Sequence, residues 1–389
     1  MKLGVVLSRI PYPLDKGDKL RAYHMLRCLS ANHEVYLFAL SEEELAFDIK
    51  EHLLAFCKEV HCFKQSPTNS MMQALKGFIM NRPLQAGYFY NSRLHQSLIA
   101  FSNNVRPDVI FFQLVRTAEY ARHLNARVKV IDYMDTFSAG YKRMSQKTSG
   151  IQRFIYSLEA KRLAQYESEI FTRFDKHLII SEQDRQEIQH PSKSSIQIIP
   201  NGVDLSYFKH DQHGKKYALL FHGNMNYLPN VDCALYIANE ILPLLHKRNR
   251  NLTLLISGAS PQKKVRQLSS RTGITVTGWL DDVRTAYAAS QIFIAPLQMG
   301  TGIQNKILEA IAMQLPCVVS PLAADALMLQ HGEHVLIGKT PDEYCDHIER
   351  LTADPQLRLY LTTKAYQYIQ TQFIWEDSVY KLANFISSN

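Results

Sequence analysis

The chain has 389 residues, of which 46% are apolar and 21% charged, and its formal net charge is +8. This length accommodates two domains of the usual ~100–200 residues, and the composition is ordinary for a soluble globular protein. The six cysteines are scattered and form no CxxC pair, which argues against a disulfide framework or a zinc site and predicts free thiols.

The N-terminal sequence MKLGVVLSRIPYP contains an apolar run that Arg9 and Pro11 interrupt, too early for a signal peptide. No stretch approaches the ~20 apolar residues of a membrane-spanning helix. We therefore expect a cytoplasmic protein. Residues 1–205 hold 27 Lys+Arg against 21 Asp+Glu, a net charge of +6, and the rest carries +2. A basic first half suits an anionic membrane or an acidic substrate, and a solvated basic surface explains it equally well.

Short apolar, β-branched runs alternate with helical patterns along the first half. The runs predicted as buried parallel strands are 3–8, 34–40, 60–63, 109–112, 128–134 and 177–181. Between the first two, residues 19–31 place Leu20, Tyr23, Leu26 and Leu29 at a helical repeat. This alternation is typical of a doubly wound α/β sheet.

The turn sequence IPNGVDLSYF (199–208) interrupts the pattern, which then restarts. The strands predicted in the second half are 217–223, 252–258, 274–279, 292–297, 317–320 and 334–338, and a long helical region (355–386) follows. We expect two Rossmann-like domains, 1–205 and 206–365, with a C-terminal helix at 366–389. Ligands of such sheets bind at the carboxyl ends of the strands, so functional residues should follow strands.

The strongest such feature is GTGIQNKILEA (300–310), where a loop enters a helix predicted at Ile303–Met313. Gly300 and Gly302 allow a phosphate to approach the backbone, and the amides of the helix start form an anion site. Lys306 would add a cation to the same phosphate. Glu309, one turn later, would accept hydrogen bonds from a ribose diol. An exposed Lys–Glu pair on a glycine-started helix is the alternative.

The run LEAIAMQLPCVVS resembles the signature of GT-B glycosyltransferases of the family-4 type, a Glu-x7-Glu pattern followed by Pro-Val-Val features. Glu309 matches its second glutamate. The first glutamate, which usually contacts the donor sugar, would fall at Thr301, so this chain departs from the pattern there. The GTGIQNK variant is similar to a branch of bacterial exopolysaccharide sugar transferases, including those associated with PEP-CTERM/exosortase systems. The segments that also match in kind and order are 10–30, 131–144, 179–184, 199–204, 223–230, 277–284 and the FIWED sequence around Trp375.

The resemblance implies two domains facing across a cleft and a C-terminal helix that returns to the first domain. It implies transfer of a sugar, with retained configuration and without a metal or other cofactor, from a nucleotide-diphosphate donor to a glycan or lipid-linked acceptor. The phosphates would lie against Lys306 and the backbone of residues 300–303, Ile303 included.

Three further loops offer candidates. In the first loop, Gly17 would let the backbone approach a phosphate and Arg21 would neutralise it, although a plain βα turn remains an alternative. Gly223 and Asn224 would donate from the loop that starts the second domain. Asp135, just after a strand, would position the donor sugar or the acceptor, with helix capping as the alternative.

Residues 70–98 mix Met, Phe, Tyr, Lys and Arg and would suit either a surface that meets the inner membrane peripherally or a packed helix. Two other functions stay open: a nucleotide-sugar 2-epimerase-like enzyme on the same fold, and a non-catalytic basic protein that binds lipid or nucleic acid. The histidines show no metal-ligand spacing, and the cleft residues give no reason to expect nucleic acid.

Overall fold

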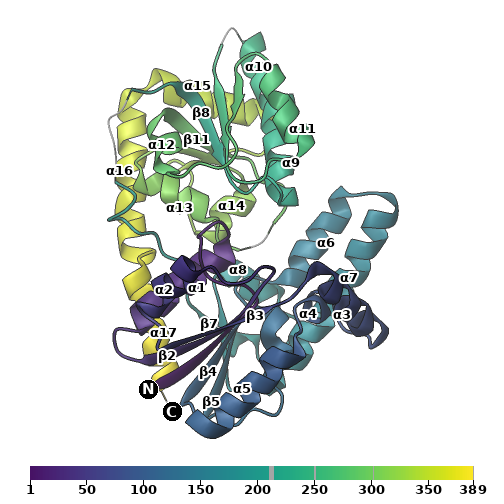
Figure 1. Ribbon diagram of the computed structural model, residues 1–389. Helices are drawn as coiled ribbons and strands as arrows, with labels where there is room; N and C mark the ends of the chain where they lie inside the picture. Colours follow the sequence, from purple (N-terminus) through teal and green to yellow (C-terminus); the bar gives the residue numbers. More distant parts are fainter. Residues whose placement is uncertain (210–213, 249–250, 301, 389) are drawn as a thin grey trace. The chain divides into compact units, whose positions relative to one another are not determined.

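The computed structural model describes residues 1–209, 214–248, 251–300 and 302–388. It divides into two compact units, Met1–Pro200 with Trp375–Asn389, and Asn201–Ile374 (Figure 1). The chain leaves the first unit five residues before the predicted position. Residues 366–374, predicted as part of the returning helix, belong to the second unit.

The first unit is built on a parallel sheet with the strand order β3-β2-β1-β4-β5-β6-β7. Its strands are β1 (Lys2–Leu7), β2 (Glu34–Ser41), β3 (Glu59–Lys64), β4 (Val109–Gln113), β5 (Val128–Asp132), β6 (Lys176–Ile179) and β7 (Gln197–Ile198). The six strands expected here are present. The two-residue β7 is too short for a sequence pattern to reveal it.

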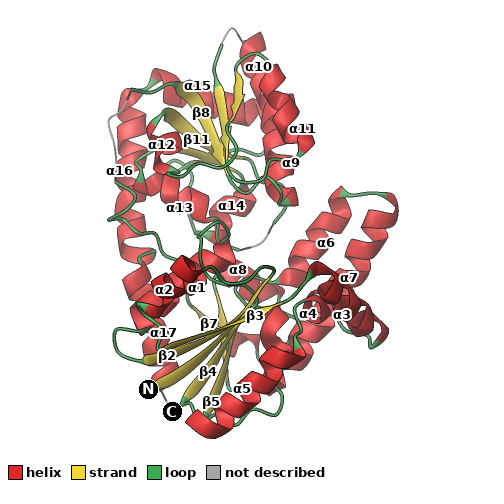
Figure 2. Ribbon diagram, in the orientation of Figure 1, coloured by secondary structure: helices red, strands yellow, loops and turns green. Residues whose placement is uncertain are grey.

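Helices cover both faces of this sheet, which is why its strands are continuous apolar runs rather than alternating ones (Figure 2). The helices are α1 (Gly17–Leu29), α2 (Phe47–Leu54), α3 (Pro67–Ile79), α4 (Leu84–Tyr88), α5 (Ser92–Val105), α6 (Phe137–Lys147), α7 (Gly150–Glu169), α8 (Glu182–Glu187) and α17 (Trp375–Ser387), with 3₁₀ turns at Val115–Ala121, Ile170–Arg173 and Lys193–Ser195. Val6 packs in a cluster with residues of α5 and α7, whereas Leu7 joins residues of α1 and α17.

The last helix fastens the end of the chain to the first unit. Trp375 is 1% exposed and its ring stacks on His24 of α1 with centroids 4.7 Å apart. Val379, Leu382 and Ile386 complete the same core cluster. The returning C-terminal helix is thus held by apolar burial along its whole length.

One detail of α1 differs from the sequence pattern. The buried face is formed by Arg21, Ala22, Met25 and Leu29 together with Leu26, whereas Leu20 and Tyr23 are only partly buried. The buried face of α1 is therefore rotated about the helix axis from the expected apolar face, and it includes an arginine.

The second unit has a six-stranded parallel sheet with the order β10-β9-β8-β11-β12-β13. Its strands are β8 (Tyr217–His222), β9 (Leu254–Ser257), β10 (Ile274–Val276), β11 (Ser290–Ala295), β12 (Cys317–Val319) and β13 (Leu336–Ile337). Its helices are α9 (Leu228–Tyr236), α10 (Leu242–Lys247), α11 (Lys263–Arg266), α12 (Arg284–Ala288), α13 (Asn305–Ala312), α14 (Pro321–Ala326), α15 (Pro341–Ala353) and α16 (Pro355–Gln372), with a π-helical turn at Ile237–Ile241 and a 3₁₀ turn at Gln267–Ser270.

Each strand order reverses at one point, between β1 and β4 in the first sheet and between β8 and β11 in the second. The loops after the two strands that flank a reversal diverge to opposite sides, which leaves a crevice at the carboxyl edge. The sequences predicted to bind the nucleotide, 223–230 and 298–304, follow β8 and β11. They therefore flank the reversal point of the second sheet.

The strands β8 and β9 end on two glycines whose backbones lie unusually close. Gly258 has φ +128°, and a Cβ at this position would lie 1.9 Å from the carbonyl oxygen of Gly223. Only glycine allows this approach.

We expect Gly258→Ala to lower the free energy of unfolding by about 3 kcal/mol or more, because the new methyl group meets rigid backbone and φ is unfavourable. Gly332→Ala is the matched control. Its φ is +77° with nothing within 4 Å of the added Cβ, and it should cost only about 1 kcal/mol. Urea unfolding of both variants measures the difference, and equal losses would contradict this account.

Candidate functional site

Lys306 lies on the first turn of α13, at the reversal point of the second sheet. Its side chain is 9% exposed, its Nζ donates to Asn230 Oδ1 at 2.5 Å, and it lies 5.0 Å from the centre of the Phe221 ring. Burial lowers the pKa of this ammonium to about 8. A buried cation held by a neutral amide and an aromatic ring retains its charge for a further, anionic partner.

Glu309 follows one turn later and is partly buried. Tyr287, which lies on α12, donates to its Oε2 at 2.7 Å, and burial raises the pKa of this carboxyl. Tyr287 is the only hydrogen-bond donor to this carboxylate within the described part of the chain. Its second oxygen remains available as an acceptor. The alternative of an exposed Lys–Glu pair does not hold, since Lys306 is buried and Glu309 is partly buried, although their charges act on each other.

The loop before α13 contains two glycines because its backbone adopts conformations that favour glycine. Gly300 and Gly302 have φ of +118° and +73°, which other residues rarely adopt. The helix begins at Asn305 rather than at Ile303, because Gln304 is extended and serves as its N-cap. The first-turn amides are therefore those of Asn305 and Lys306, and Ile303 lies before the helix with 8% exposure. Thr301 lies outside the described residues.

The backbone of Gly223 lies next to the ammonium group of Lys306. A Cβ at Gly223 would lie 2.9 Å from Lys306 Nζ and 2.8 Å from Asn230 Nδ2, so the glycine makes room for the ammonium. Asn224 accepts from the amide of Asn226 with its side chain and from Asn230 Nδ2 with its carbonyl. Asn224 thus shapes the loop, and Asn230 connects that loop to Lys306.

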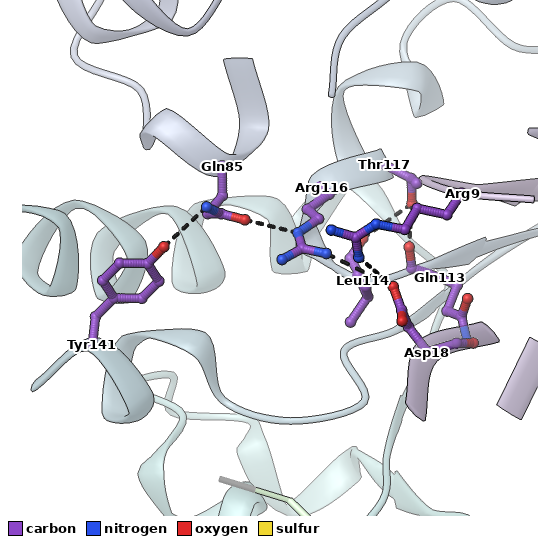
Figure 3. Close-up of polar contacts among 8 residues, drawn as sticks. All are labelled: Arg9, Asp18, Gln85, Gln113, Leu114, Arg116, Thr117 and Tyr141. Carbon is purple, nitrogen blue, oxygen red and sulfur yellow. Dashed lines mark hydrogen bonds and ion pairs between the residues drawn. The ribbon is translucent and has the colours of Figure 1, made fainter. Parts of the chain in front are cut away.

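In the first unit, two arginines share one carboxylate at the carboxyl edge (Figure 3). Arg9 follows β1 and donates to Asp18 Oδ2 at 2.6 Å, and Arg116 follows β4 with its Nη1 3.8 Å from the same oxygen. Both guanidinium groups lie over the ring of Phe89, at 5.1 and 4.6 Å from its centre. Burial, and then the charge of Arg9, lower the pKa of Arg116 to about 10. The two cations flank the reversal point of the first sheet.

Arg21, which the sequence suggested as a phosphate ligand, lies elsewhere. Its side chain is fully buried, and its Nε donates to the equally buried Asp132 of β5 at 2.6 Å. A ligand cannot reach an enclosed guanidinium, so the structure places Arg21 in an internal ion pair and Arg9 and Arg116 at the edge. Gly17 is exposed as the first residue of α1, beside the exposed Lys16.

Asp135 is partly buried in the loop between β5 and α6, and its charge acts on both Arg116 and Glu167. Its neighbour in the sequence motif, Ser138, donates from Oγ to Glu167 Oε2 at 2.6 Å. Burial raises the pKa of Glu167 to about 8. Glu167 of α7 thus accepts hydrogen bonds from the start of α6.

A cavity of about 340 Å³ opens at the carboxyl ends of β1, β2 and β3. Its lining combines cations, carboxylates, an amide and aromatic rings, among them Arg9, Lys16, Glu43, Gln65, Tyr88 and Phe89. Aromatic faces with hydrogen-bonding groups around them suit a sugar ring.

The described residues contain no group of three or more His, Cys, Asp or Glu side chains placed to hold a metal ion. Within the same residues, every helix is too short or too polar to cross a membrane.

Comparison with known proteins identifies the second unit. Residues 216–354 match the family model "Glycosyl transferases group 1". This segment is therefore similar to glycosyltransferase group 1 domains. The whole chain has the GT-B fold: it superposes on HepE from Anabaena in complex with UDP with a TM-score of 0.70 and 14% identity, covering 100% of both chains. It also resembles WaaG, a glycosyltransferase involved in lipopolysaccharide biosynthesis, with a TM-score of 0.65, 14% identity and 100% coverage of both.

A relative in sequence is the "Uncharacterized 44.6 kDa protein in cps region" of Klebsiella pneumoniae, which is 24% identical over 388 residues and 96% of each chain.

Sequence reasoning did not single out Asn230, Tyr287, Arg9 or Arg116. Asn230 stands within the segment GNMNYLPN (223–230), and Arg9 follows the first strand, but nothing local distinguishes them. Tyr287 belongs to no motif, because its contact with Glu309 depends on the approach of α12 to α13.

The depressed pKa of Lys306 predicts a pH effect on stability. Its folded pKa of about 8 lies below the ordinary lysine pKa of 10.5, so between these values the unfolded chain binds the proton and the folded one does not. Stability should therefore rise relative to Lys306→Met from pH 8 to 10.5, by up to about 3 kcal/mol. Denaturant unfolding of both proteins at several pH values measures this. Lys263→Met, on exposed α11, is the control and should show no such trend.

Proposed function

We propose that the protein transfers a sugar from a nucleotide-diphosphate donor to a hydroxyl group of a glycan or lipid-linked glycan, in the synthesis of a polysaccharide. The glycosyltransferase group 1 domain supports the reaction class. The UDP complex of HepE supports the donor class, and the cps-region relative and WaaG support the polysaccharide setting.

The observation that carries the proposal is the buried Lys306 at the reversal point of the second sheet. The β- and α-phosphates would lie against its ammonium and the first-turn amides of α13, with Gly223, Gly300 and Gly302 leaving room for them. These groups would stabilise the charge that develops on the diphosphate as the sugar leaves, without a metal. Glu309 would accept the ribose hydroxyls with the oxygen that Tyr287 leaves available.

The acceptor would occupy the cavity of the first unit. Phe89 and Tyr88 offer ring faces, and Glu43 and Gln65 offer acceptors for sugar hydroxyls. Asp135, after β5 of the same edge, would position the acceptor or the donor sugar. Retention of configuration is part of the proposal and follows from the family resemblance. A 2-epimerase would need no acceptor cavity, so analysis of the product made without acceptor separates the two.

The first test is a thermal-shift screen of wild type with UDP, GDP, CMP, ADP and their sugars. A ligand that binds only the folded state at a hundred times its Kd stabilises by about 2.7 kcal/mol. We expect one nucleotide to raise the Tm, and Glu309→Gln to reduce that shift because it weakens acceptance from the ribose diol. No shift with any nucleotide at millimolar concentration would reject the proposed donor site.

Tyr287→Phe is the matched comparison for Glu309→Gln, because it removes the donor to Oε2 and leaves the carboxylate in place. It should retain most of the nucleotide shift. If both variants lose it equally, Glu309 acts through the packing of α12 rather than by contact with the ribose.

The acceptor side gives a separate prediction. Arg9→Gln removes a charge from the cavity wall and should raise the KM for the acceptor about tenfold or more, the cost of a charged hydrogen bond. The nucleotide-induced Tm shift should not change, since Arg9 belongs to the other unit. Lys50→Gln, on exposed α2, should leave both quantities unaltered. An unchanged KM in Arg9→Gln would place the acceptor elsewhere.

A further inference from the structure

The positive charge of the chain is concentrated in two acid-free stretches. Residues 60–107 contain five lysines and arginines and no aspartate or glutamate, and residues 136–158 contain four and none. These nine charges exceed the net charge of +8, so the remaining sequence, with 35 basic and 36 acidic residues, is almost neutral. The basic character is therefore a local property of the first unit.

The same two stretches expose large apolar side chains. Among the described residues, eight of the nineteen exposed large hydrophobic side chains lie there: Met71, Met72, Leu75, Ile79, Met80, Ile151, Phe154 and Ile155. Ile79 and Ile151 are 77% and 76% exposed. We call these eight residues the α3–α7 surface.

Helix α3 exposes this face because its opposite face packs against α4. Ala74 and Gly77 are buried, and a Cβ at Gly77 would lie 3.3 Å from the Cα of Gly87 in α4. Met71, Leu75 and Ile79 are spaced by four residues and so form a stripe on the opposite side. A stripe that neither the core nor α4 covers costs free energy in water unless it has a partner.

Specific contacts join the helices α3 and α7 that carry the two parts of this surface. Arg162 of α7 lies 3.9 Å from the centre of the Phe78 ring and donates to the carbonyl of Phe78 at 3.1 Å. Glu159 accepts from the amides of Leu84 and Gln85 in α4. Ile155 precedes Arg162 by seven residues and so lies on the same side of α7. Figure 1 shows α3, α4, α6 and α7 grouped on one side of the first unit.

Exposed cations border the apolar side chains. Lys76 lies on α3, Arg153 on α7, and Lys142 and Lys147 on α6, and all four side chains are exposed. Apolar side chains bordered by cations, without acids, match an anionic bilayer. The apolar groups enter the acyl boundary, and each cation near lipid phosphates adds to the affinity.

We propose that the α3–α7 surface docks the first unit on an anionic lipid bilayer. The occupant is the membrane surface itself, because the absence of carboxylates over both stretches fits a continuous sheet of negative charge better than a protein partner of mixed charge. A membrane contact of this kind would bring the enzyme to a lipid-linked acceptor. The docking does not depend on the transfer reaction, since lipid binding requires neither donor nor acceptor.

The test is co-sedimentation of the full chain with vesicles, without substrates. Wild type should bind vesicles of equimolar phosphatidylcholine and phosphatidylglycerol, and bind pure phosphatidylcholine much less. Ile79→Ser combined with Phe154→Ser should weaken binding about tenfold or more, because two large apolar side chains are lost from the interface. Lys76→Gln combined with Arg153→Gln should weaken it several-fold and reduce its dependence on salt.

Phe47→Ser combined with Leu359→Ser is the matched control. These residues of α2 and α16 are 75% and 67% exposed, close to Ile79 and Phe154, but lie outside both acid-free stretches. The control should bind vesicles like wild type. Equal loss in both double variants, or no binding of wild type to anionic vesicles, would overturn the proposal. Self-association of wild type that the Ile79/Phe154 variant abolishes, without vesicle binding, would assign the surface to a second copy and overturn it too.

Discussion

The candidate site of the second unit depends on the burial of one ammonium group beside a glycine. Lys306 is placed among Phe221, Asn230 and Gly223, and none of these carries a charge. Desolvation of the ammonium is unfavourable and is only partly offset, which is why its pKa falls to about 8. The backbone of Gly258 packs closely on Gly223, and the absence of a side chain at Gly223 leaves the space that the lysine ammonium occupies. The charge of Glu309 compensates the ammonium in part, and an anion in this crevice would add to that compensation.

In the first unit, the carboxylates near each arginine distinguish a buried structural arginine from arginines that could bind a ligand. Arg21 and Asp132 form an ion pair with no exposure, which connects α1 with β5. Arg9 and Arg116 share Asp18, and Asp135 also acts on Arg116; burial, and then the charge of Arg9, still lower the pKa of Arg116. Both groups stay partly exposed, with side-chain exposures of 29% and 15%. The shared carboxylate leaves positive charge at the sheet edge, beside the cavity.

The sequence predicted the fold well because parallel sheets covered on both faces produce continuous apolar runs. Of the thirteen strands in the described part of the chain, twelve were expected, and the GT-B fold is confirmed by the superposition on HepE and WaaG. The apolar period of α1 was misleading, since Arg21 replaces an apolar residue on its buried face once Asp132 neutralises it. The start of α13 was placed two residues early because the conformations of Gly302 and Gln304 are not encoded by periodicity. Asn230 and Tyr287 depend on contacts between elements far apart in sequence, for which a single sequence has no signal.

The net charge of the chain was a poor guide to its partners because basic and acidic surfaces are separated within the first unit. Residues 1–205 have a net charge of +6, although their two acid-free stretches carry +9, so the rest of that half is acidic by three. Part of this acid, including Glu42, Glu43 and Glu44, lines the cavity at the carboxyl edge. Basic and acidic surfaces are thus separated within one unit, and their opposite charges partly cancel in the net charge of residues 1–205. Charges more than about 10 Å apart are largely screened at physiological salt, so each surface selects its own partner. A carboxylate-lined cavity favours hydroxyl groups, whereas an acid-free face favours phosphates.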